Sequence, residues 1–178
     1  MRKNDALRKT VLAALFLAIG MILPLFTAQI KEIGDSLLPM HIPVMLCGLL
    51  CGPWYGGFIG LALPFIRSVT FGMPPLYPNA VWMALELATY GLVIGVVYRS
   101  LKIKGVWNTY VSLIIAMLSG RVVWGIAKAV LLGVGGKAFT VSMFIVGGFI
   151  DAALGIVLQL ILIPLVMAIV GRFYNGKG

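Results

Sequence analysis

The amino-acid sequence predicts an all-α integral membrane protein, with six transmembrane helices in one compact bundle and both termini in the cytoplasm. Composition is the first indication, because 61% of the residues are hydrophobic and only 11% are charged, whereas soluble domains have about 25% charged residues. Length is the second. A spanning helix needs about 20 apolar residues, so the chain of 178 residues has room for about six spans in a single membrane domain, residues 1–178.

Each apolar stretch of the chain is expected to form one helix. The expected spans are residues 7–26, 38–51, 54–69, 77–98, 109–134 and 139–170. The segments that separate them are polar or rich in turn-forming residues, namely 27–36, Gly52-Pro53, Pro74-Pro75, the basic connector 99–108, and Gly135-Gly136-Lys137. Prolines interrupt or bound the second and third spans, and broken helices are tolerated at membrane depth where they line a cavity inside the protein.

Basic residues predict the orientation in the membrane, because Lys and Arg concentrate in cytoplasmic segments. With the N-terminus inside, nine basic residues fall on the cytoplasmic side: Arg2, Lys3, Arg8, Lys9, Arg99, Lys102, Lys104, Arg172 and Lys177. Only Lys31 and Lys137 fall outside. The net charge of +9 therefore indicates topology and contact with anionic lipid headgroups rather than nucleic acid. A cleaved signal peptide is the alternative for the first span, but the apolar run is long and five further spans follow.

Five ionisable residues lie inside stretches that otherwise read as lipid-spanning: Arg67, Glu86, Arg121, Lys128 and Asp151. Each would cost at least about 2.5–3.5 kcal/mol in hydrocarbon, so such residues normally face a cavity or one another. Arg121 and Lys128 are two helical turns apart and share a face with Trp124. Acidic residues on the flanking helices can meet that face. The sequence therefore indicates that the protein handles a polar small molecule.

Two interpretations of these charges remain open. They form buried ion pairs for packing alone, Arg121 with Asp151 and Lys128 with Glu86, or they line a pocket for a polar ligand. In the second case Trp82, Tyr90, Trp124 and Gln159 supply stacking and hydrogen bonds. The segment 67–79, with Arg67, Tyr77 and Asn79, either caps that pocket or is an ordinary connection. His41 is a weaker candidate, equally suited to a local hydrogen bond.

Catalytic and metal-binding patterns are not found in the sequence. The chain has one histidine, no GxSxG, HExxH or phosphate-binding GxxxxGK[ST] segment, and so no expected catalytic residue, cofactor or means of hydrolysing ATP. Cys47 and Cys51 are expected to be packing residues, since no further cysteine or histidine completes a zinc set.

Small residues at a spacing of four predict close helix contacts. Ala14 and Ala18 on the first span form a strip that fits either a partner protein or a neighbouring helix of the same chain. Similar pairs, Gly52/Gly56, Gly56/Gly60 and Gly91/Gly95, are expected to pack internally.

These features together resemble the substrate-binding S components of energy-coupling factor (ECF) transporters, which take up vitamins in bacteria and archaea. The resemblance covers nearly the whole chain: a short basic N-terminus, six spans in under 200 residues, the AxxxA pair Ala14 and Ala18, and a Gly-Pro turn leading from an apolar helix into a glycine-rich one. It implies location in the prokaryotic plasma membrane, a transmembrane T component that grips the alanine face, and two cytoplasmic ATPases. It also implies a ligand pocket near the external side, formed by the last three spans and the loops after the first and third. The N-terminus lacks the Met-His segment of nickel and cobalt members.

The ligand is expected to be a small water-soluble vitamin or related micronutrient. Arg67, Arg121 and Lys128 exceed Glu86 and Asp151 by one charge, which favours an anionic or zwitterionic ligand such as pantothenate over a cation such as thiamine. Pyridoxine-like, riboflavin-like and modified-base ligands stay open, because aromatic side chains are available to stack on a ring. Two alternatives are a stand-alone secondary transporter coupled to protons or sodium, and a membrane scaffold without a small ligand.

Overall fold

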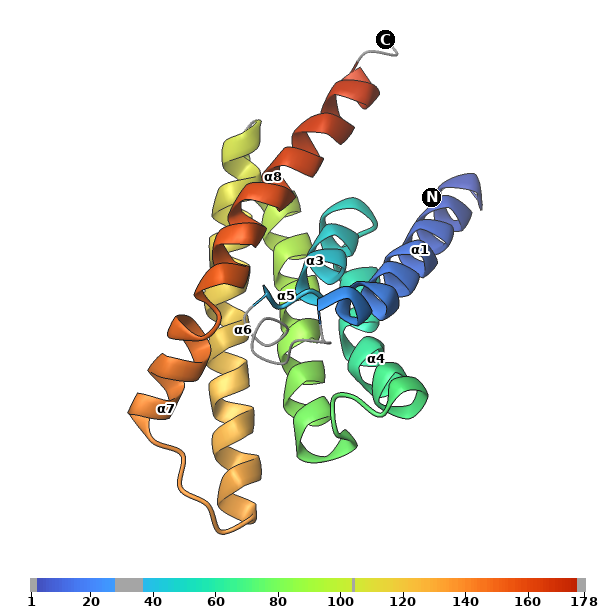
Figure 1. The fold of residues 1–178 in the computed structure, drawn as a ribbon. Coiled ribbons are helices and arrows are strands. Elements are labelled where there is room, and N and C mark those ends of the chain that lie inside the picture. The colour runs from blue at the N-terminus through green and yellow to red at the C-terminus, as the bar shows by residue number, and fades with distance from the viewer. Residues whose placement is uncertain (1–2, 28–36, 104, 176–178) are drawn as a thin grey trace.

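The computed structural model describes residues 3–27, 37–103 and 105–175, and these form helices joined by short turns (Figure 1). The α-helices are α1 (Lys3–Thr27), α3 (His41–Leu50), α4 (Pro53–Phe71), α5 (Val81–Ser100), α6 (Val106–Val134), α7 (Val141–Ile145) and α8 (Ala153–Asn175). Two π-helical turns, η1 (Leu76–Ala80) and η2 (Val146–Ile150), precede α5 and follow α7. No strand occurs in these ranges, so the all-α prediction is confirmed.

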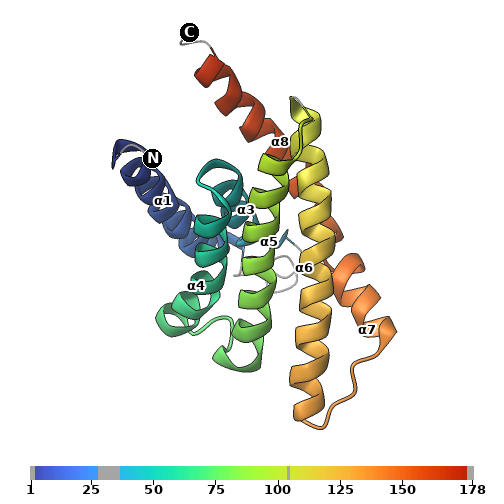
Figure 2. The same ribbon diagram turned by 180° about the vertical axis from the view of Figure 1, so that it is seen from behind.

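Helices α5 and α6 form an antiparallel pair at the centre of the molecule. In both views α1, α3 and α4 lie on the α5 side, whereas α7 and α8 lie on the α6 side (Figures 1 and 2). Helix α8 also contacts α3. The two marked termini and the turn from α5 to α6 lie toward the same end of the molecule (Figure 1). Which side of the membrane this end faces stays a prediction from the basic residues.

Four helices are long and apolar enough to cross a membrane: Asn4–Phe26, Leu76–Ser100, Val106–Val134 and Ala153–Arg172. His41–Leu50 and Val141–Ile150 are shorter apolar helices. The predicted count of six transmembrane helices is not confirmed, because the described residues form seven α-helices of very unequal length. The predicted polar segment after the first span falls largely on residues 28–36, outside the described residues. The same holds for four of the basic residues used for orientation, Arg2, Lys31, Lys104 and Lys177.

The predicted sixth span, residues 139–170, is not one helix. Helix α7 ends at Ile145, η2 runs to Ile150, and a turn precedes α8. Gly147 and Gly148 lie in this interruption, and glycine disfavours a helix interior by about 1 kcal/mol relative to alanine. Hydrophobic length alone hides such a break, because it records how apolar a segment is and not where it bends.

Glycines allow α3, α4 and α5 to meet backbone to backbone. A Cβ atom on Gly91 would lie 2.2 Å from the carbonyl group of Gly56, and one on Gly56 would lie 2.6 Å from the Cα atom of Gly48. A Cβ on Gly60 would lie 2.3 Å from the carbonyl oxygen of Leu87. The prediction that the glycine pairs of these helices pack internally is thus confirmed. These glycines, with Gly95, are called the glycine contact below.

The boundaries of α4 follow from local chemistry. Gly52 precedes it with φ 124° and Pro53 takes its first position, which suits a residue that lacks an amide hydrogen. Gly72 ends the helix with φ 69° and donates its N–H to the carbonyl oxygen of Ser68, 3.0 Å away, as a left-handed glycine cap does. Arg67 therefore lies inside α4, as the predicted span 54–69 has it, and the predicted connecting segment 67–79 begins only after Phe71.

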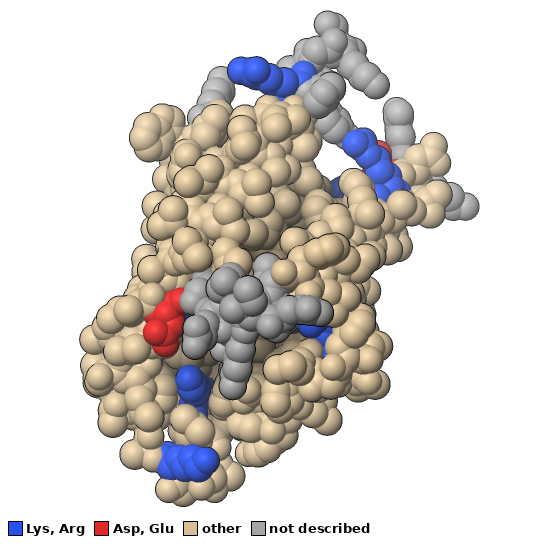
Figure 3. All heavy atoms as spheres, viewed as in Figure 1, with Lys and Arg blue, Asp and Glu red and all other residues tan. Residues whose placement is uncertain are grey.

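The outer faces of the molecule are apolar. In α1 and α8 only 22% of the residues in the most apolar window are buried, against 44% in α5 and α6. The face seen in Figure 3 is mostly uncharged, with charged atoms near its upper end and in its lower part. An apolar exterior over the length of the helices is what contact with lipid requires.

Candidate functional site

Three contacts in series join the facing sides of α5 and α6. The α5 members are spaced four residues apart, so they lie on one face of that helix. Because the two helices are antiparallel, successive α5 residues meet α6 residues in the reverse order. The Tyr90 ring packs on Gly120, where a Cβ would lie 2.7 Å from the ring. Glu86 pairs with Arg121 at 2.9 Å, and the Lys128 ammonium lies 5.4 Å from the centroid of the Trp82 ring. These three contacts are called the α5–α6 ladder.

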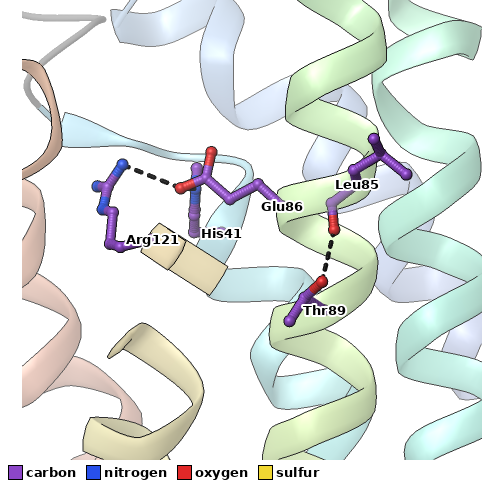
Figure 4. Close-up of polar contacts among 5 residues, drawn as sticks. All are labelled: His41, Leu85, Glu86, Thr89 and Arg121. Atoms are coloured by element: carbon purple, nitrogen blue, oxygen red, sulfur yellow. Dashed lines mark hydrogen bonds and ion pairs between the residues drawn. The ribbon is translucent and has the colours of Figure 1, made fainter. Parts of the chain in front are cut away.

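The centre of the ladder is a buried ion pair. The Arg121 Nη1 atom donates to the Glu86 Oε1 atom over 2.9 Å, and the two residues are 4% and 2% exposed. Figure 4 shows the guanidinium and the carboxylate pointing toward each other from α6 and α5, with His41 beside the carboxylate. The carboxylate is thereby neutralised at a depth where an isolated charge is costly.

His41 is the second neighbour of this carboxylate, and it begins α3. Its Nε2 atom lies 3.6 Å from the Glu86 Oε1 atom, too far for a hydrogen bond. Its ring meets the Tyr90 ring edge to face at 5.1 Å. The side chain is 2% exposed and neither ring nitrogen has a hydrogen-bond partner in the described part of the chain. Because buried polar groups are normally paired, this histidine has unused hydrogen-bonding capacity.

Lys128 lies in an aromatic cage. Its ammonium group is 4.5 Å from the Trp124 ring centroid, 5.4 Å from that of Trp82 and 5.8 Å from that of Phe139. Such contacts stabilise a cation by about 0.5–2 kcal/mol each. Lys128 is half-buried and forms no ion pair with a described carboxylate. A positive charge therefore stands beside the ladder with no described carboxylate within ion-pair distance, although Asp151 and Glu86 both act on it electrostatically.

The turn η2 closes this cage from the other side. A Cβ on Gly147 would lie 3.2 Å from the Trp124 ring, and one on Gly148 would lie 3.5 Å from the same ring and 3.9 Å from the Arg121 side chain. Phe144 also packs on Trp124, with ring centroids 6.1 Å apart. The two glycines let the chain approach the indole closely, which explains why the helix is interrupted at this point.

The charge pairing differs from the packing interpretation drawn from the sequence. Arg121 pairs with Glu86 and not with Asp151, and Lys128 meets aromatic rings and not Glu86. Asp151 is exposed. Spacing along a helix indicates which face a residue lies on, but it does not determine which neighbouring helix that face meets.

The other predicted ligand residues are placed differently. Gln159 is 1% exposed on α8 and its Nε2 atom has no hydrogen-bond partner among the described residues. Arg67 is 3% exposed; it donates to the carbonyl oxygen of Met21 on α1 and lies over the Phe71 ring. Tyr77 is 61% exposed in η1, and Asn79 is half-buried. Six of the predicted residues thus come together: Trp82, Glu86, Tyr90, Arg121, Trp124 and Lys128. Five others are joined to this group by no hydrogen bond, ion pair or ring contact in the described structure: Arg67, Tyr77, Asn79, Asp151 and Gln159.

Ala14 and Ala18 are exposed on α1. The buried residues of that helix include Ala13 and Phe16, which lie on its opposite side. The alanine strip is therefore available to a partner in the described structure, and its role as a partner surface stays a prediction.

Sequence reasoning gave too little weight to His41 and did not single out Phe139, Gly147 or Gly148. His41 is the only histidine of the chain and precedes an apolar run, and these two features could have indicated a buried polar residue. Gly147 and Gly148 meet Trp124 in the break before α8, which hydropathy did not reveal, and Phe139 meets Trp124 and Lys128 from the segment between α6 and α7. Chemically, the ladder presents hydrogen-bonding groups, a cation and flat aromatic surfaces, and groups of these kinds are suited to a polar solute that carries a ring or a negative charge. No group of three or more His, Cys, Asp or Glu residues in the described ranges could hold a metal ion.

A protein-family sequence model described as "ECF transporter, substrate-specific component" matches residues 8–171. No curated protein and no solved structure matches. The matched region contains every residue of the ladder, the aromatic cage and the alanine strip.

Proposed function

Because the chain belongs to the family of substrate-specific components of ECF transporters, we propose that it captures a small water-soluble vitamin or related micronutrient at the α5–α6 ladder. Membership makes it a multi-pass membrane protein and a transport subunit rather than an enzyme. In the proposal it works in a prokaryotic plasma membrane with an ECF T component and two cytoplasmic ATPases, which supply the ATP hydrolysis.

The charge of the ligand is argued from the cation in the aromatic cage. Glu86 is already neutralised by Arg121, and Lys128 has no carboxylate within ion-pair distance among the described residues, although Asp151 and Glu86 act on its charge. Asp151 is exposed, and Arg67 is buried on α4, where it donates to the Met21 carbonyl oxygen. Arg121 and Lys128 therefore exceed the one buried acid of the ladder by one positive charge. An anionic or zwitterionic ligand, pantothenate being the example, is favoured, because a carboxylate can bind the Lys128 ammonium.

A cationic ligand such as thiamine is disfavoured for the same reason. Trp82, Trp124 and Phe139 would suit a cation, but the ammonium of Lys128 already lies among these rings. A second cation would meet like-charge repulsion in a site with few counter-charges. The single observation that carries this proposal is the placement of Lys128.

Hydrogen bonds to the ligand are assigned to His41 and Gln159. Each is at most 2% exposed and has a side-chain nitrogen without a partner among the described residues, and a polar solute would satisfy such groups. Tyr90 and Trp124 are assigned to ring contacts. Four further residues stay candidate ligand contacts because of their positions in the sequence: Arg67, Tyr77, Asn79 and Asp151.

The direct test is to identify what the protein binds. The chain is purified alone, bound small molecules are extracted and identified by mass spectrometry, and affinities are measured for pantothenate, thiamine, pyridoxine and riboflavin. We expect an anionic or zwitterionic vitamin to co-purify and to bind most tightly. Tightest binding of thiamine would contradict the charge argument, and absence of any ligand would support the scaffold alternative.

The partner surface is tested on α1. Ala14→Trp and Ala18→Trp are expected to abolish uptake in cells that contain the energising subunits, because an indole prevents close approach of a helix to the alanine strip. Ligand binding to the purified protein should stay unchanged, since both residues are exposed on the side of α1 away from the core. Ile126→Trp, on an exposed face of α6, is the control and should keep uptake. Loss of ligand binding in the alanine variants would show that the strip belongs to the internal core.

A further inference from the structure

A cavity lies where α5 ends, α6 begins and α8 ends, and no residue of the ladder lines it. It has a volume of about 750 Å³ and is lined by residues of the α5–α6 connection and of the C-terminal half of α8, including Tyr98, Asn108, Thr109, Met167 and Arg172. The basic residues predict that this end of the molecule lies in the cytoplasm. Nothing in the proposed capture of a vitamin uses this cavity.

The start of α6 provides hydrogen-bond donors at this cavity. Gly105 precedes the helix with φ 74° and no side chain caps it. The amide groups of Val106 and Trp107 belong to the first turn, whose N–H groups lack partners within a helix, and Val106 lines the cavity. The positive end of the helix dipole lies at the same place and favours an anion.

Thr109 is the independent indication of a ligand. It is 2% exposed and lines the cavity, yet its hydroxyl makes no hydrogen bond within the described part of the chain. Threonines on exposed faces of other helices do bond to a carbonyl oxygen one turn back, as Thr89 does to Leu85 over 2.8 Å. A buried threonine that lines a cavity, and whose hydroxyl has no hydrogen-bond partner among the described residues, is suited to a polar partner from outside the chain.

The walls of the cavity are fixed and partly positive. Asn108 donates from Nδ2 to the Tyr98 carbonyl oxygen over 2.9 Å and accepts from the Ser112 hydroxyl at 3.4 Å, which ties the end of α5 to the start of α6. Arg172 contributes a guanidinium from α8, and guanidinium groups bind phosphate through two parallel hydrogen bonds. Arg172 and the first-turn amide groups of α6 are thus hydrogen-bond donors at this cavity.

Aromatic residues place this cavity at the level of lipid headgroups. Trp107 is 73% exposed on the first turn of α6, and its ring lies 6.3 Å from that of Tyr110. Exposed Trp and Tyr residues mark the boundary between membrane and water. The remaining lining is aliphatic, from residues such as Ile103, Met167 and Ala168. A ligand here can place a charged group on the donors and an apolar chain along the helices.

We propose that this cavity binds the phosphate headgroup of an anionic phospholipid, held by the Thr109 hydroxyl, the Arg172 guanidinium and the first-turn amides of α6. The bound lipid joins the end of α8 to the α5–α6 connection. Basic pockets between transmembrane helices on the cytoplasmic side are suited to such headgroups. This site is independent of the vitamin site.

The test uses the full chain in nanodiscs that contain equal amounts of phosphatidylglycerol and phosphatidylcholine, followed by native mass spectrometry of the lipids that stay bound. We expect phosphatidylglycerol to be enriched in the wild type. Arg172→Gln and Thr109→Val should each reduce this enrichment about tenfold, since a hydrogen bond to a charged group contributes about 1.5–3 kcal/mol. Lys137→Gln, which removes an exposed cation at the far end of α6, should change nothing.

Each other outcome overturns the proposal. Equal retention of the two lipids would show that the site is not selective for an anion. Displacement of phosphatidylglycerol by inorganic phosphate at millimolar concentration would show that a free anion is the ligand. Unchanged enrichment in Arg172→Gln, an exposed position where folding is not at risk, would remove the proposed contact. Vitamin affinity is measured in the same variants and should stay at the wild-type value, so failure here is distinguishable from failure of the vitamin proposal.

Discussion

The two sides of α5 are packed in opposite ways. On one side the glycine contact brings α5 against α3 and α4, so that a Cβ on Gly91 would lie 2.2 Å from the Gly56 backbone. On the other side the α5–α6 ladder joins the helices through a carboxylate, a guanidinium and aromatic rings, and His41 beside them has ring nitrogens without partners among the described residues. Backbone packed against backbone offers no side chain to a ligand, whereas side chains with unpaired polar groups are suited to one. One helix thus joins a side packed through its backbone to the side at which we propose that the ligand binds.

The largest effect is expected from a methyl group on the rigid side. Gly91→Ala should lower the free energy of unfolding by at least about 3 kcal/mol, the upper end for over-packing, because the new Cβ meets backbone that cannot move aside. Unfolding in a denaturing detergent titration measures this. Gly133→Ala in α6 is the matched control, because no atom lies within 4 Å of its Cβ position. Equal stability of the two variants would show that the glycine contact is not tight.

The next effect separates stability from binding within the ladder. Glu86→Met and Arg121→Met should each lower the free energy of unfolding by about 3–5 kcal/mol, because each leaves one buried charge unpaired, while the double variant should recover most of this loss. Ligand binding should be lost in all three proteins. Isothermal titration calorimetry and unfolding titrations provide the two measurements. Recovery of binding in the double variant would show that the pair serves packing alone.

A smaller effect is expected where the proposed ligand meets the cation. Lys128→Met keeps the length of the side chain and removes its charge, so the affinity for an anionic vitamin should fall about tenfold, as for the loss of one hydrogen bond to a charged group. The free energy of unfolding should fall by about 1–2 kcal/mol, because the ammonium loses its contacts with the rings of Trp82, Trp124 and Phe139 and the methionine thioether replaces them only in part. Lys137→Met is the control in the exposed turn after α6. Unchanged affinity for every vitamin would remove Lys128 from the site.

The smallest effect is expected when the same change, glycine to alanine, is made on the other side of the molecule. Gly147→Ala places a Cβ 3.2 Å from the Trp124 ring, which is a side-chain contact that can adjust by a small shift. The free energy of unfolding should change by less than about 1 kcal/mol, since the helix-favouring alanine offsets the crowding. The same detergent titration compares it with Gly91→Ala. A loss as large as that of Gly91→Ala would mean that η2 is packed as tightly as the glycine contact.

The sequence was informative about single helices and weak about their neighbours. The central helices were predicted to within a few residues, as with 109–134 against the observed Val106–Val134, because hydrophobic length and turn residues are local properties. Trp82, Glu86 and Tyr90 were identified for a related reason, since charged and aromatic residues in an apolar helix stand out. The break at Gly147 and Gly148 was missed, because it depends on a contact with Trp124 that is more than twenty residues away in the chain.

The sequence by itself determined that the chain is helical, apolar on its exterior and supplied with buried charges, because composition and periodicity fix how each segment meets lipid. Only the tertiary structure decided which charges meet. It paired Glu86 with Arg121, placed His41 beside them and put Lys128 among aromatic rings. The physical reason is that helix periodicity specifies a face but not the helix that covers it, and that choice follows from how closely backbones can approach at the glycine contact and at η2.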